Sequence, residues 1–343
     1  MPPGDVVDKA LSARPRKWLV TGAAGFIGSH LVETLLARGQ AVVGLDDFSN
    51  GHRRNLEDVR AAVSAEQWGR FRLLEADIRD AGACREASAG VELVLHQAAL
   101  GSVPKSIADP LRWHSVNATG SLNVFLSARD AGVQRVVYAS SSSVYGDDPE
   151  LPRREARTGR PLSPYASSKA GMELDAQVMS SCYGLQAIGL RYFNVFGPRQ
   201  DPEGAYAAVV PQWTFAMLAG LPTAINGDGE TSRDFCYVAN VVQANLLAAL
   251  TPEPEAVNRV YNIGAGARTS LNELHRMLCA LVQPFATAAL SAPLQRELRA
   301  GDVRHSHADI SLARELLGYR PEFDVRRGLE LTVGWYAARR AQK

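Results

Sequence analysis

Short apolar runs alternate with stretches of helical periodicity through most of the chain, after a polar leader of sixteen residues. Continuous apolar runs of this length are typical of strands buried on both faces of a sheet. We expect strands at residues 18–20, 41–45, 71–74, 93–96, 136–140 and 187–191, and helices most clearly at residues 26–38, 111–131 and 165–183. The alternation predicts an α/β fold built on a doubly wound parallel sheet of the Rossmann type.

The alternation of apolar runs and helical stretches ends at Phe193, and glycines, prolines and a turn at residues 226–229 interrupt the shorter elements that follow. Residues 260–264 form another apolar run, so we expect the chain to return to the sheet before it ends. The sequence thus predicts a Rossmann domain at residues 1–192 and 236–264. Residues 193–235 and 265–343 are expected to form a smaller C-terminal α/β lobe that holds the substrate.

Composition and charge exclude several classes of protein. Hydrophobic residues make up 46% and charged residues 21% of the 343 positions, as in ordinary globular chains. Lys plus Arg number 37 and Asp plus Glu 36, so the chain lacks the basic surplus that nucleic-acid binding needs. The leader has no long apolar run, and no later segment approaches the length of a membrane span, so we expect neither a secretory signal nor an anchor.

The four cysteines are far apart and form no zinc-ligand pattern with histidines, so no metal site is expected. They are Cys84, Cys182, Cys236 and Cys279. We interpret them as reduced structural thiols of a cytoplasmic protein.

A glycine-rich segment joins the first expected strand to the first expected helix. Gly22, Gly25 and Gly28 follow the spacing G-x-x-G-x-x-G. Glycines there permit a tight turn and let a pyrophosphate approach the helix N-terminus, whose free N–H groups favour anions. Turn and packing glycines are the alternative, but the strand before and the helix after favour a dinucleotide site.

The second expected strand ends in an acidic pair, and Asp46 lies eighteen residues after Gly28. A carboxylate there can accept hydrogen bonds from the adenosine ribose and repels a 2′-phosphate, which favours NAD over NADP. Arg53 and Arg54 either soften this preference or belong to a solvated basic loop. Asp77, after the third strand, either contacts the adenine or caps a helix.

Two further patterns carry candidate chemistry. Tyr165 and Lys169 lie four residues apart on one face of an expected helix, where the ammonium favours ionisation of the phenol. The pair alone could be an ordinary surface pair. However, a row of serines at residues 140–143 ends a sheet strand upstream, at the edge where open parallel sheets bind ligands.

These motifs, in this order, resemble the extended short-chain dehydrogenase/reductase family from Lys17 to the C-terminal region. Within it, the segments 96–99, 140–146, 165–169, 191–194 and 233–235, together with Asn117, look like the UDP-hexose 4-epimerases. The resemblance implies an NAD-binding Rossmann domain and a nucleotide-sugar-binding lobe. The cofactor residues that it implies are Gly22, Gly25, Phe26, Ile27, Gly28, Asp46, Asn50, Asp77, Ile78, Gln97, Ala98, Ala99, Asn117, Tyr165, Lys169, Tyr192 and Phe193.

The same resemblance implies the chemistry. Tyr165 is the base that takes the C4 hydroxyl proton, Lys169 holds the nicotinamide ribose and lowers the tyrosine pKa, and Ser141 binds the reacting oxygen. A transient 4-keto sugar and enzyme-bound NADH then return to sugar and NAD. Related dehydratases and decarboxylases carry an acidic residue where this chain has Ser141, Ser142 and Ser143, so simple epimerisation is favoured.

For the nucleotide, the family's diphosphate contacts match Asn194, Arg233 and Arg299, with Arg296 and Arg304 as competitors for the last. An arginine can pair two phosphate oxygens at once. The full set of expected substrate residues is Gly101, Ser102, Ser141, Ser142, Ser143, Asn194, Ala208, Val209, Arg233, Arg299, Asp302 and Ser306.

Two small residues suggest the sugar. Gly101 stands where glucose-specific relatives usually have lysine, and Ser306 aligns with a tyrosine of the pocket wall. The smaller side chains favour UDP-N-acetylglucosamine and UDP-N-acetylgalactosamine, although Ser306 is a plain loop serine if the alignment slips.

Two other interpretations stay open at this point. A net dehydrogenase or reductase would fit the cofactor half equally well, and a nucleotide-binding regulator could keep the fold without activity. The sequence does not settle which UDP-sugar, including uronic-acid forms, is physiological. The long helices at residues 111–131 and 165–183 resemble those of the family's four-helix interface, so we expect a homodimer.

Overall fold

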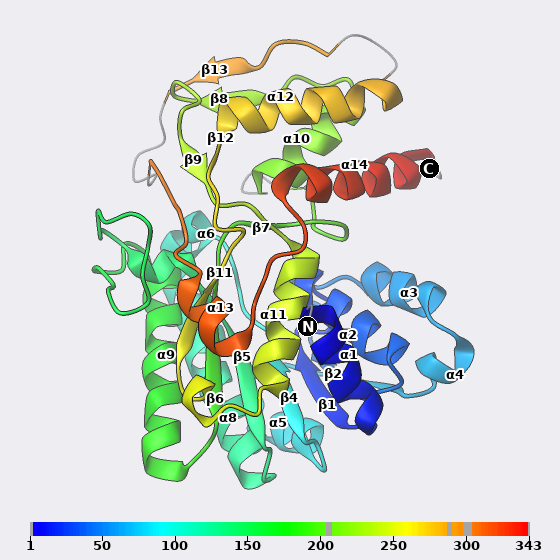
Figure 1. Ribbon diagram of the computed structural model, residues 1–343, viewed down its shortest axis with the longest axis vertical. Coiled ribbons are helices and arrows are strands. Elements are labelled where there is room, and N and C mark those ends of the chain that lie inside the picture. The colour runs from blue at the N-terminus through cyan, green and yellow to red at the C-terminus, as the bar shows by residue number, and fades with distance from the viewer. Residues whose placement is uncertain (1–2, 204–207, 287–289, 298–303, 342–343) are drawn as a thin grey trace.

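A computed structural model describes residues 3–203, 208–286, 290–297 and 304–341. Seven parallel strands form one sheet in the order β11-β6-β5-β4-β1-β2-β3 (Figure 1). Their bounds are β1 Lys17–Thr21, β2 Ala41–Asp46, β3 Phe71–Glu75, β4 Leu93–His96, β5 Arg135–Ser141, β6 Ala187–Tyr192 and β11 Val260–Ile263. All six strands expected before Phe193 are present, and the last strand returns from the C-terminal lobe to pair with β6, as expected.

Helices cover both faces of this sheet, because its strands are apolar on both sides. One layer contains α2 Phe26–Ala37, α11 Val238–Leu250 and α13 Ser311–Leu317. The other contains α5 Ala81–Ser88, α8 Ser121–Asp130 and α9 Pro164–Tyr183 (Figure 1). Two short helices, α3 Arg53–Ala62 and α4 Ala65–Trp68, lie between β2 and β3. The doubly wound Rossmann-type fold predicted from the pattern is therefore confirmed.

The helix expected at residues 111–131 is interrupted. It consists of α7 Pro110–His114, a π-helical turn at Ser115–Gly120 and α8. The short helix α6 Val103–Ala108 precedes it. Such π turns commonly mark functional positions, and this one carries the buried side chain of Asn117. Periodicity did not reveal it, because one wider turn hardly disturbs the apolar pattern.

The polar leader contains an element that the sequence did not predict. It forms α1 Pro3–Ala13, which packs against α11. Val7 and Leu11 are the buried residues of its inner face. Two apolar positions among charged neighbours gave too weak a periodicity to indicate a helix.

The C-terminal lobe lies beyond the carboxyl ends of the sheet strands (Figure 1). Helices α10 Val209–Leu218, α12 Leu271–Val282 and α14 Val325–Ala341 pack on one another. Short strand pairs accompany them: β7 Val195–Phe196 with β10 Cys236–Tyr237, β9 Ser232–Arg233 with β12 Thr269–Ser270, and β8 Ala224–Asn226 with β13 Leu294–Arg296. Short 3-10 turns lie at Ser142–Tyr145, Pro254–Ala256 and Gln283–Phe285.

One stretch that we assigned to the C-terminal lobe packs with the sheet instead. Ala308, Ile310, Leu317 and Tyr319 belong to the same hydrophobic core as β1 and α2. After β11 the chain enters the C-terminal lobe and then returns to the sheet once more at these residues. Among the residues that the structure describes, no helix is both long and apolar enough to span a membrane.

Candidate active site

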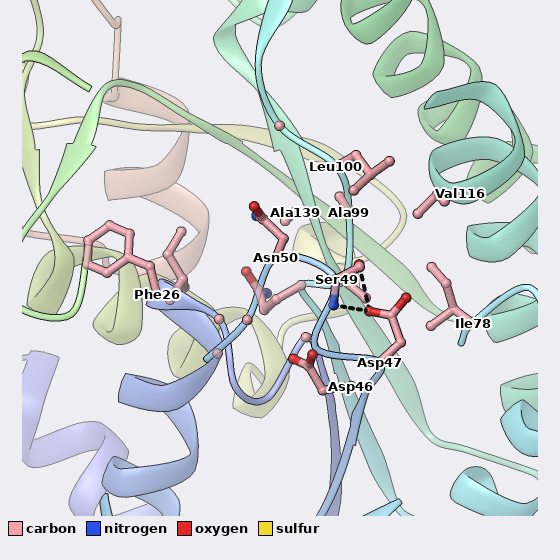
Figure 2. A pocket seen from close by; sticks show the side chains of 18 of the residues that line it. Phe26, Asp46, Asp47, Ser49, Asn50, Ile78, Ala99, Leu100, Val116 and Ala139 are labelled. Atoms are coloured by element: carbon pink, nitrogen blue, oxygen red, sulfur yellow. Dashed lines mark hydrogen bonds between the residues drawn. The ribbon is translucent and has the colours of Figure 1, made fainter. Parts of the chain in front are cut away.

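The main cleft lies at the carboxyl edge of the sheet, where the strand order reverses between β1 and β4. Open α/β sheets bind ligands at this point, because the loops after the two strands leave in opposite directions. The cleft has a volume of about 420 Å³. Figure 2 shows its lining, with Asp46 and Asp47 at the end of β2, Phe26 at the start of α2 and Ile78 on the other side.

The glycine-rich loop forms the floor of the cleft. Gly22 has a φ of +67°, a left-handed conformation that favours glycine, and a Cβ there would lie 2.8 Å from the backbone N of Ala98. A Cβ on Gly28 would lie 1.9 Å from the carbonyl oxygen of Gly22. Side chains at these positions would therefore clash with backbone, and the loop keeps the N-terminus of α2 open to the cleft.

Asp46 is buried at the end of β2 and joins two loops. Its Oδ2 accepts a hydrogen bond from the backbone N of Ala24 and its Oδ1 one from that of Phe48, both at 2.8 Å. Burial raises the pKa of Asp46, and these two hydrogen bonds lower it in part. Its neighbour Asp47 is exposed and bonds Ser49 (Figure 2). Asp46 is thus the more rigidly held of the two carboxylates.

The two arginines near this carboxylate are both engaged. Arg53 donates to both oxygens of Glu75 at 2.7 and 2.6 Å, and its guanidinium lies 4.2 Å from the centre of the Phe48 ring. Arg54 lies 3.7 Å from an oxygen of Asp201. Neither partner is Asp46, so its carboxylate remains available to a ribose.

The alternative role considered for Asp77 is wrong. The N-cap of α5 is Asp80, whose side chain accepts from the backbone N of Gly82 and Ala83. Asp77 instead lines the cleft and bonds Arg79, which lowers the pKa of the Asp77 carboxyl.

Fifteen of the expected cofactor residues line the cleft, and two do not. Asn117 is fully buried, where its amide bonds the backbone N and O of Leu100 and the hydroxyl of Ser168. Phe193 is fully buried against the ring of Tyr145, 6.0 Å between centroids. Both side chains shape the site from behind, which differs from the direct contact we expected.

The cleft also includes residues outside the sets assigned to cofactor and substrate, of which Asp47 and Ser140 belong to patterns noted in the sequence. They are Leu45, Asp47, Ser49, Gly51, Ala76, Leu100, Val116, Ala139, Ser140, Val195 and Gln200. Most are direct neighbours of expected positions and could have been added by extending each motif. Val195 and Gln200 come from the crossover into the second lobe, and no local pattern indicates them.

Tyr165, Lys169 and Ser141 all line the cleft, and the Tyr165 side chain is hydrogen-bonded to Ser141. Ser163 caps α9 by accepting from the backbone N of Ala166, and Tyr165 lies in the helix's first turn. Lys169 follows one turn later, and its ammonium donates to the carbonyl oxygen of Ala139 at 2.7 Å. Since Ala139 belongs to β5, this bond holds the helix against the strand that ends in Ser141.

The protonation of these groups is set mainly by burial. Burial raises the pKa of Tyr165, and its hydrogen bond with Ser141 lowers it in part. Burial also lowers the pKa of Lys169 to about 8, while Glu173 acts in the opposite direction. The protein alone therefore does not produce the lowered tyrosine pKa that the resemblance implied. A cation bound beside the phenol would be needed to lower it.

On the substrate side, Gly101 and Ser141 line the cleft, while Ser102, Ser142 and Ser143 do not. Ser102 caps α6 by accepting from the backbone N of Lys105. Ser143 donates from its hydroxyl to Ser141 Oγ at 2.9 Å, so it orients the serine that faces the cleft.

The remaining described substrate candidates lie around one stretch of the C-terminal lobe. Asn194, at a φ of +30°, donates to the carbonyl oxygen of Asp234, and Ser306 N donates to the carbonyl oxygen of Ser232. Arg233 donates to the carbonyl oxygens of Ser232 and Arg304. Ala208 and Val209 begin α10, and Arg299 and Asp302 lie outside the described residues.

The residues present fit NAD. A loop without side chains at Gly22 and Gly28 leaves backbone N–H groups for a pyrophosphate. The Asp46 carboxylate is held at the end of β2, where it suits a ribose, and Tyr165 and Lys169 line the same cleft. The cleft thus offers each part of a dinucleotide a matching surface.

Comparison with known proteins agrees with this geometry. Residues 18–264 match the model of the NAD dependent epimerase/dehydratase family. A UDP-glucose 4-epimerase of Mycolicibacterium smegmatis is 40% identical over 325 residues, 93% of this chain and 97% of its own length. A structure of UDP-N-acetylglucosamine 4-epimerase from Methanobrevibacter ruminantium M1, in complex with UDP-N-acetylmuramic acid, is 35% identical with a TM-score of 0.86, covering 95% of this chain and 99% of that one. The UDP-glucose 4-epimerase of Thermus thermophilus, in complex with NAD, is 35% identical with a TM-score of 0.79, covering 93% and 98%. The chain is therefore an NAD-dependent epimerase, and it belongs to the NAD dependent epimerase/dehydratase family.

Proposed function

We propose that this enzyme inverts C4 of UDP-N-acetylglucosamine and UDP-N-acetylgalactosamine, and that it also accepts UDP-glucose and UDP-galactose. One observation carries the proposal: Tyr165, Ser141 and Lys169 line the same cleft as the residues that fit NAD. A base, a hydrogen-bonding hydroxyl and an ammonium in that cleft suit oxidation of a secondary alcohol and its reversal.

The chain's own groups divide the work. Tyr165 Oη takes the proton of the C4 hydroxyl and later returns it. Ser141, oriented by Ser143, holds the reacting oxygen. Lys169 is buried and held by Ala139, and its ammonium would bind the nicotinamide ribose of the cofactor. Bound NAD supplies the hydride acceptor, so the protein contributes orientation and electrostatics.

The diphosphate is assigned to Asn194 and Arg233, with Arg299 and Asp302 completing the substrate set. Asn194 and Arg233 flank the buried Asp234, which accepts hydrogen bonds from the backbone N of Ala265, Gly266 and Ala308. Two separate segments, at residues 265–266 and at Ala308, are thereby fixed to the residue that follows Arg233. Such support keeps binding groups in place without reorganisation.

A roomy sugar pocket supports the N-acetylated substrates. A Cβ added at Gly101 would meet no atom within 4 Å, so the wall is open there. An acetamido group at C2 needs more space than a hydroxyl does. Ser306, which bonds Ser232 through its backbone, presents only a small side chain to its surroundings.

The experiment is to incubate the pure protein, without added NAD, with the N-acetylated, neutral and uronic-acid UDP-sugars and to follow C4 by proton NMR. Conversion between UDP-N-acetylglucosamine and UDP-N-acetylgalactosamine is expected. Conversion of UDP-glucose alone would reject the N-acetyl assignment. Net appearance of reduced cofactor in place of conversion would favour the dehydrogenase hypothesis.

We also propose a cytoplasmic homodimer. Ile107, Leu111, Leu174 and Val178 are apolar and 52–81% exposed, and they lie on α6, α7 and α9, which pack together. Two copies of this face would bury one another, as the resemblance to four-helix interfaces implies. The four thiols are free, as is typical of a reducing compartment. The test is to measure the molar mass of the wild type and of Leu111→Glu by light scattering. A wild-type mass of one chain, unchanged in the variant, would reject the dimer.

A further inference from the structure

One turn beyond Lys169, α9 carries a second buried charge that the proposed chemistry does not use. Glu173 is 7% exposed and lies four residues after Lys169, so the two side chains are neighbours on one helical face. Its partner is Arg191 of β6, 4% exposed. Arg191 Nε donates to Glu173 Oε1 at 2.9 Å, and Nη2 donates to Oε2 at 2.7 Å.

The Glu173 carboxylate also binds the catalytic strand. Ser140 Oγ donates to Glu173 Oε1 at 2.5 Å, and Ser140 lies between Ala139 and Ser141 on β5. Lys169 is therefore bound to one residue of this strand and Glu173 to the next. Ser140 also lies directly opposite Arg191 in the register of β5 with β6. Two consecutive turns of α9 are thus fixed to the two strands next to Tyr165.

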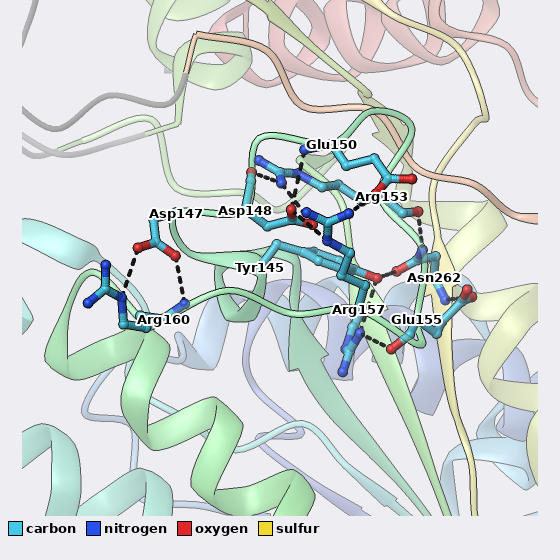
Figure 3. Close-up of polar contacts among 10 residues, drawn as sticks. Tyr145, Asp147, Asp148, Glu150, Arg153, Glu155, Arg157, Arg160 and Asn262 are labelled. Carbon is cyan, nitrogen blue, oxygen red and sulfur yellow. Dashed lines mark hydrogen bonds and ion pairs between the residues drawn. The ribbon is translucent and has the colours of Figure 1, made fainter.

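Arg191 extends this anchor to β11 at the edge of the sheet. Its Nη1 donates to the Tyr145 hydroxyl and to the carbonyl oxygen of Glu155, both at 3.1 Å. Figure 3 shows Tyr145 and Glu155 reaching Asn262 of β11: the tyrosine hydroxyl donates to Asn262 Oδ1, and Asn262 N donates to Glu155 Oε1. All three nitrogens of the Arg191 guanidinium have hydrogen-bond partners, so both side chains of the pair are held in place.

Three charged side chains are thus buried together: the cations Lys169 and Arg191 and the anion Glu173. Other titratable groups facing them are His96 of β4, Tyr138 of β5 and Tyr165, together with Tyr145 and Glu155, which lie beside Arg191. Burial and proximity to Lys169 lower the pKa of His96 to about 3, so it is neutral. Burial raises the pKa of Tyr138 far above its usual range, so it is neutral too. Glu173 alone supplies negative charge to Lys169 among the described groups whose interaction with it is resolved.

We propose that Glu173 and Arg191 are a positioning pair for the catalytic centre. The Glu173 carboxylate fixes α9 to the end of β5 and stabilises the protonated form of Lys169. Arg191, as a second cation beside Glu173, weakens that stabilisation. The inference rests on the roles proposed for Tyr165 and Lys169. It assigns neither Glu173 nor Arg191 a contact with substrate or cofactor.

The proposal predicts a change in the pH dependence of kcat that a purely structural role of the pair would not produce. Lys169 acts as a protonated donor, so its loss of a proton defines the high-pH limb of kcat. Glu173→Gln removes the anion, Lys169 releases its proton more readily, and the limb moves down by about one pH unit. Arg191→Gln removes the cation that is paired with Glu173, so the carboxylate stabilises protonated Lys169 more strongly and the limb moves up.

The experiment measures kcat for epimerisation from about pH 6 to about pH 10 in the wild-type holoenzyme and both variants. Above both limbs, the ratio of wild-type to Glu173→Gln activity should be about tenfold larger than at neutral pH, since a shift of one pKa unit is a tenfold change in protonation. Glu33→Gln is the matched control, because Glu33 lies on a different helix, α2, and pairs with the buried Arg199, so the limb should stay in place.

Opposite displacements of the two limbs support the proposal. Parallel profiles, or displacements in the same direction, would show that the pair is only structural and would overturn it. If one variant fails to fold, the direction of the other decides alone. Tyr165→Phe distinguishes failure of the positioning role from failure of the proposed function. If Tyr165→Phe is inactive and the limbs of Glu173→Gln and Arg191→Gln match the wild type, only the positioning role fails. If Tyr165→Phe is active, the proposed function itself fails.

Discussion

Removing one oxygen from Tyr165 tests its assignment as the base. Tyr165→Phe keeps the ring in the first turn of α9 and leaves its backbone N bonded to Ser106. Ser141 loses a partner, but its Oγ still accepts from the backbone N and the hydroxyl of Ser143. No buried polar atom is left unpaired, so the free energy of unfolding should change by less than about 1 kcal/mol.

The effect on catalysis should be much larger. One general acid–base group usually contributes about 10² to 10⁴ in rate, which corresponds to about 2.7 to 5.4 kcal/mol of activation free energy. The variant should therefore lose at least about a hundredfold in kcat while its bound NAD stays at the wild-type level. Its melting temperature should fall by less than about 4 °C.

The assay combines proton NMR of C4 with cofactor extraction and thermal unfolding on the same preparation. Tyr183→Phe is the matched control, because Tyr183 ends the same helix and is 54% exposed. It should retain full activity. A Tyr165→Phe enzyme with more than half of wild-type kcat would refute the assignment, and a large drop in melting temperature would show that the loss of activity is one of folding.

Three further substitutions test other parts of the site. Asp46→Ala should weaken NAD retention and narrow the preference over NADP, as titrations would show, whereas Asp47→Ala, at the exposed neighbour, should change neither. Ser306→Tyr should reduce kcat/KM for the N-acetylated sugars at least about fivefold relative to UDP-glucose, since overpacking costs about 1 to 3 kcal/mol; equal losses for both would refute the pocket argument. Leu35→Ala, at a fully buried core position of α2, should lower the free energy of unfolding by about 2 to 5 kcal/mol in denaturant titrations, and a smaller loss would mean that the core closes the gap.

The elements and residues that sequence reasoning found are those with local patterns. The glycine loop, Asp46 and the Tyr165–Lys169 pair each follow from spacing within one strand or helix, and the structure places all of them on the cleft. The sheet was predictable for the same reason, because its strands are apolar on both faces.

What the sequence did not reveal depends on contacts between distant segments. Arg191 begins one of the segments that carry the family resemblance, but no local pattern indicates its pairing with Glu173, which forms only when α9 packs on β6. The exclusion of Asn117 from the cleft follows from the π turn, whose extra residue turns the side chain toward Leu100. Helix α1 was missed because its stability comes from packing on α11 rather than from its own periodicity.

The central claim is that the hydrogen removed from C4 returns to C4 of the same sugar within one turnover. The most direct test is to run the epimerisation of UDP-N-acetylglucosamine to equilibrium in heavy water, without added cofactor, and to read the product by proton NMR. The account predicts that UDP-N-acetylgalactosamine forms with protium fully retained at C4. Deuterium at C4 would contradict it, because the inversion would then proceed by exchange with solvent, and absence of the product would contradict the substrate assignment.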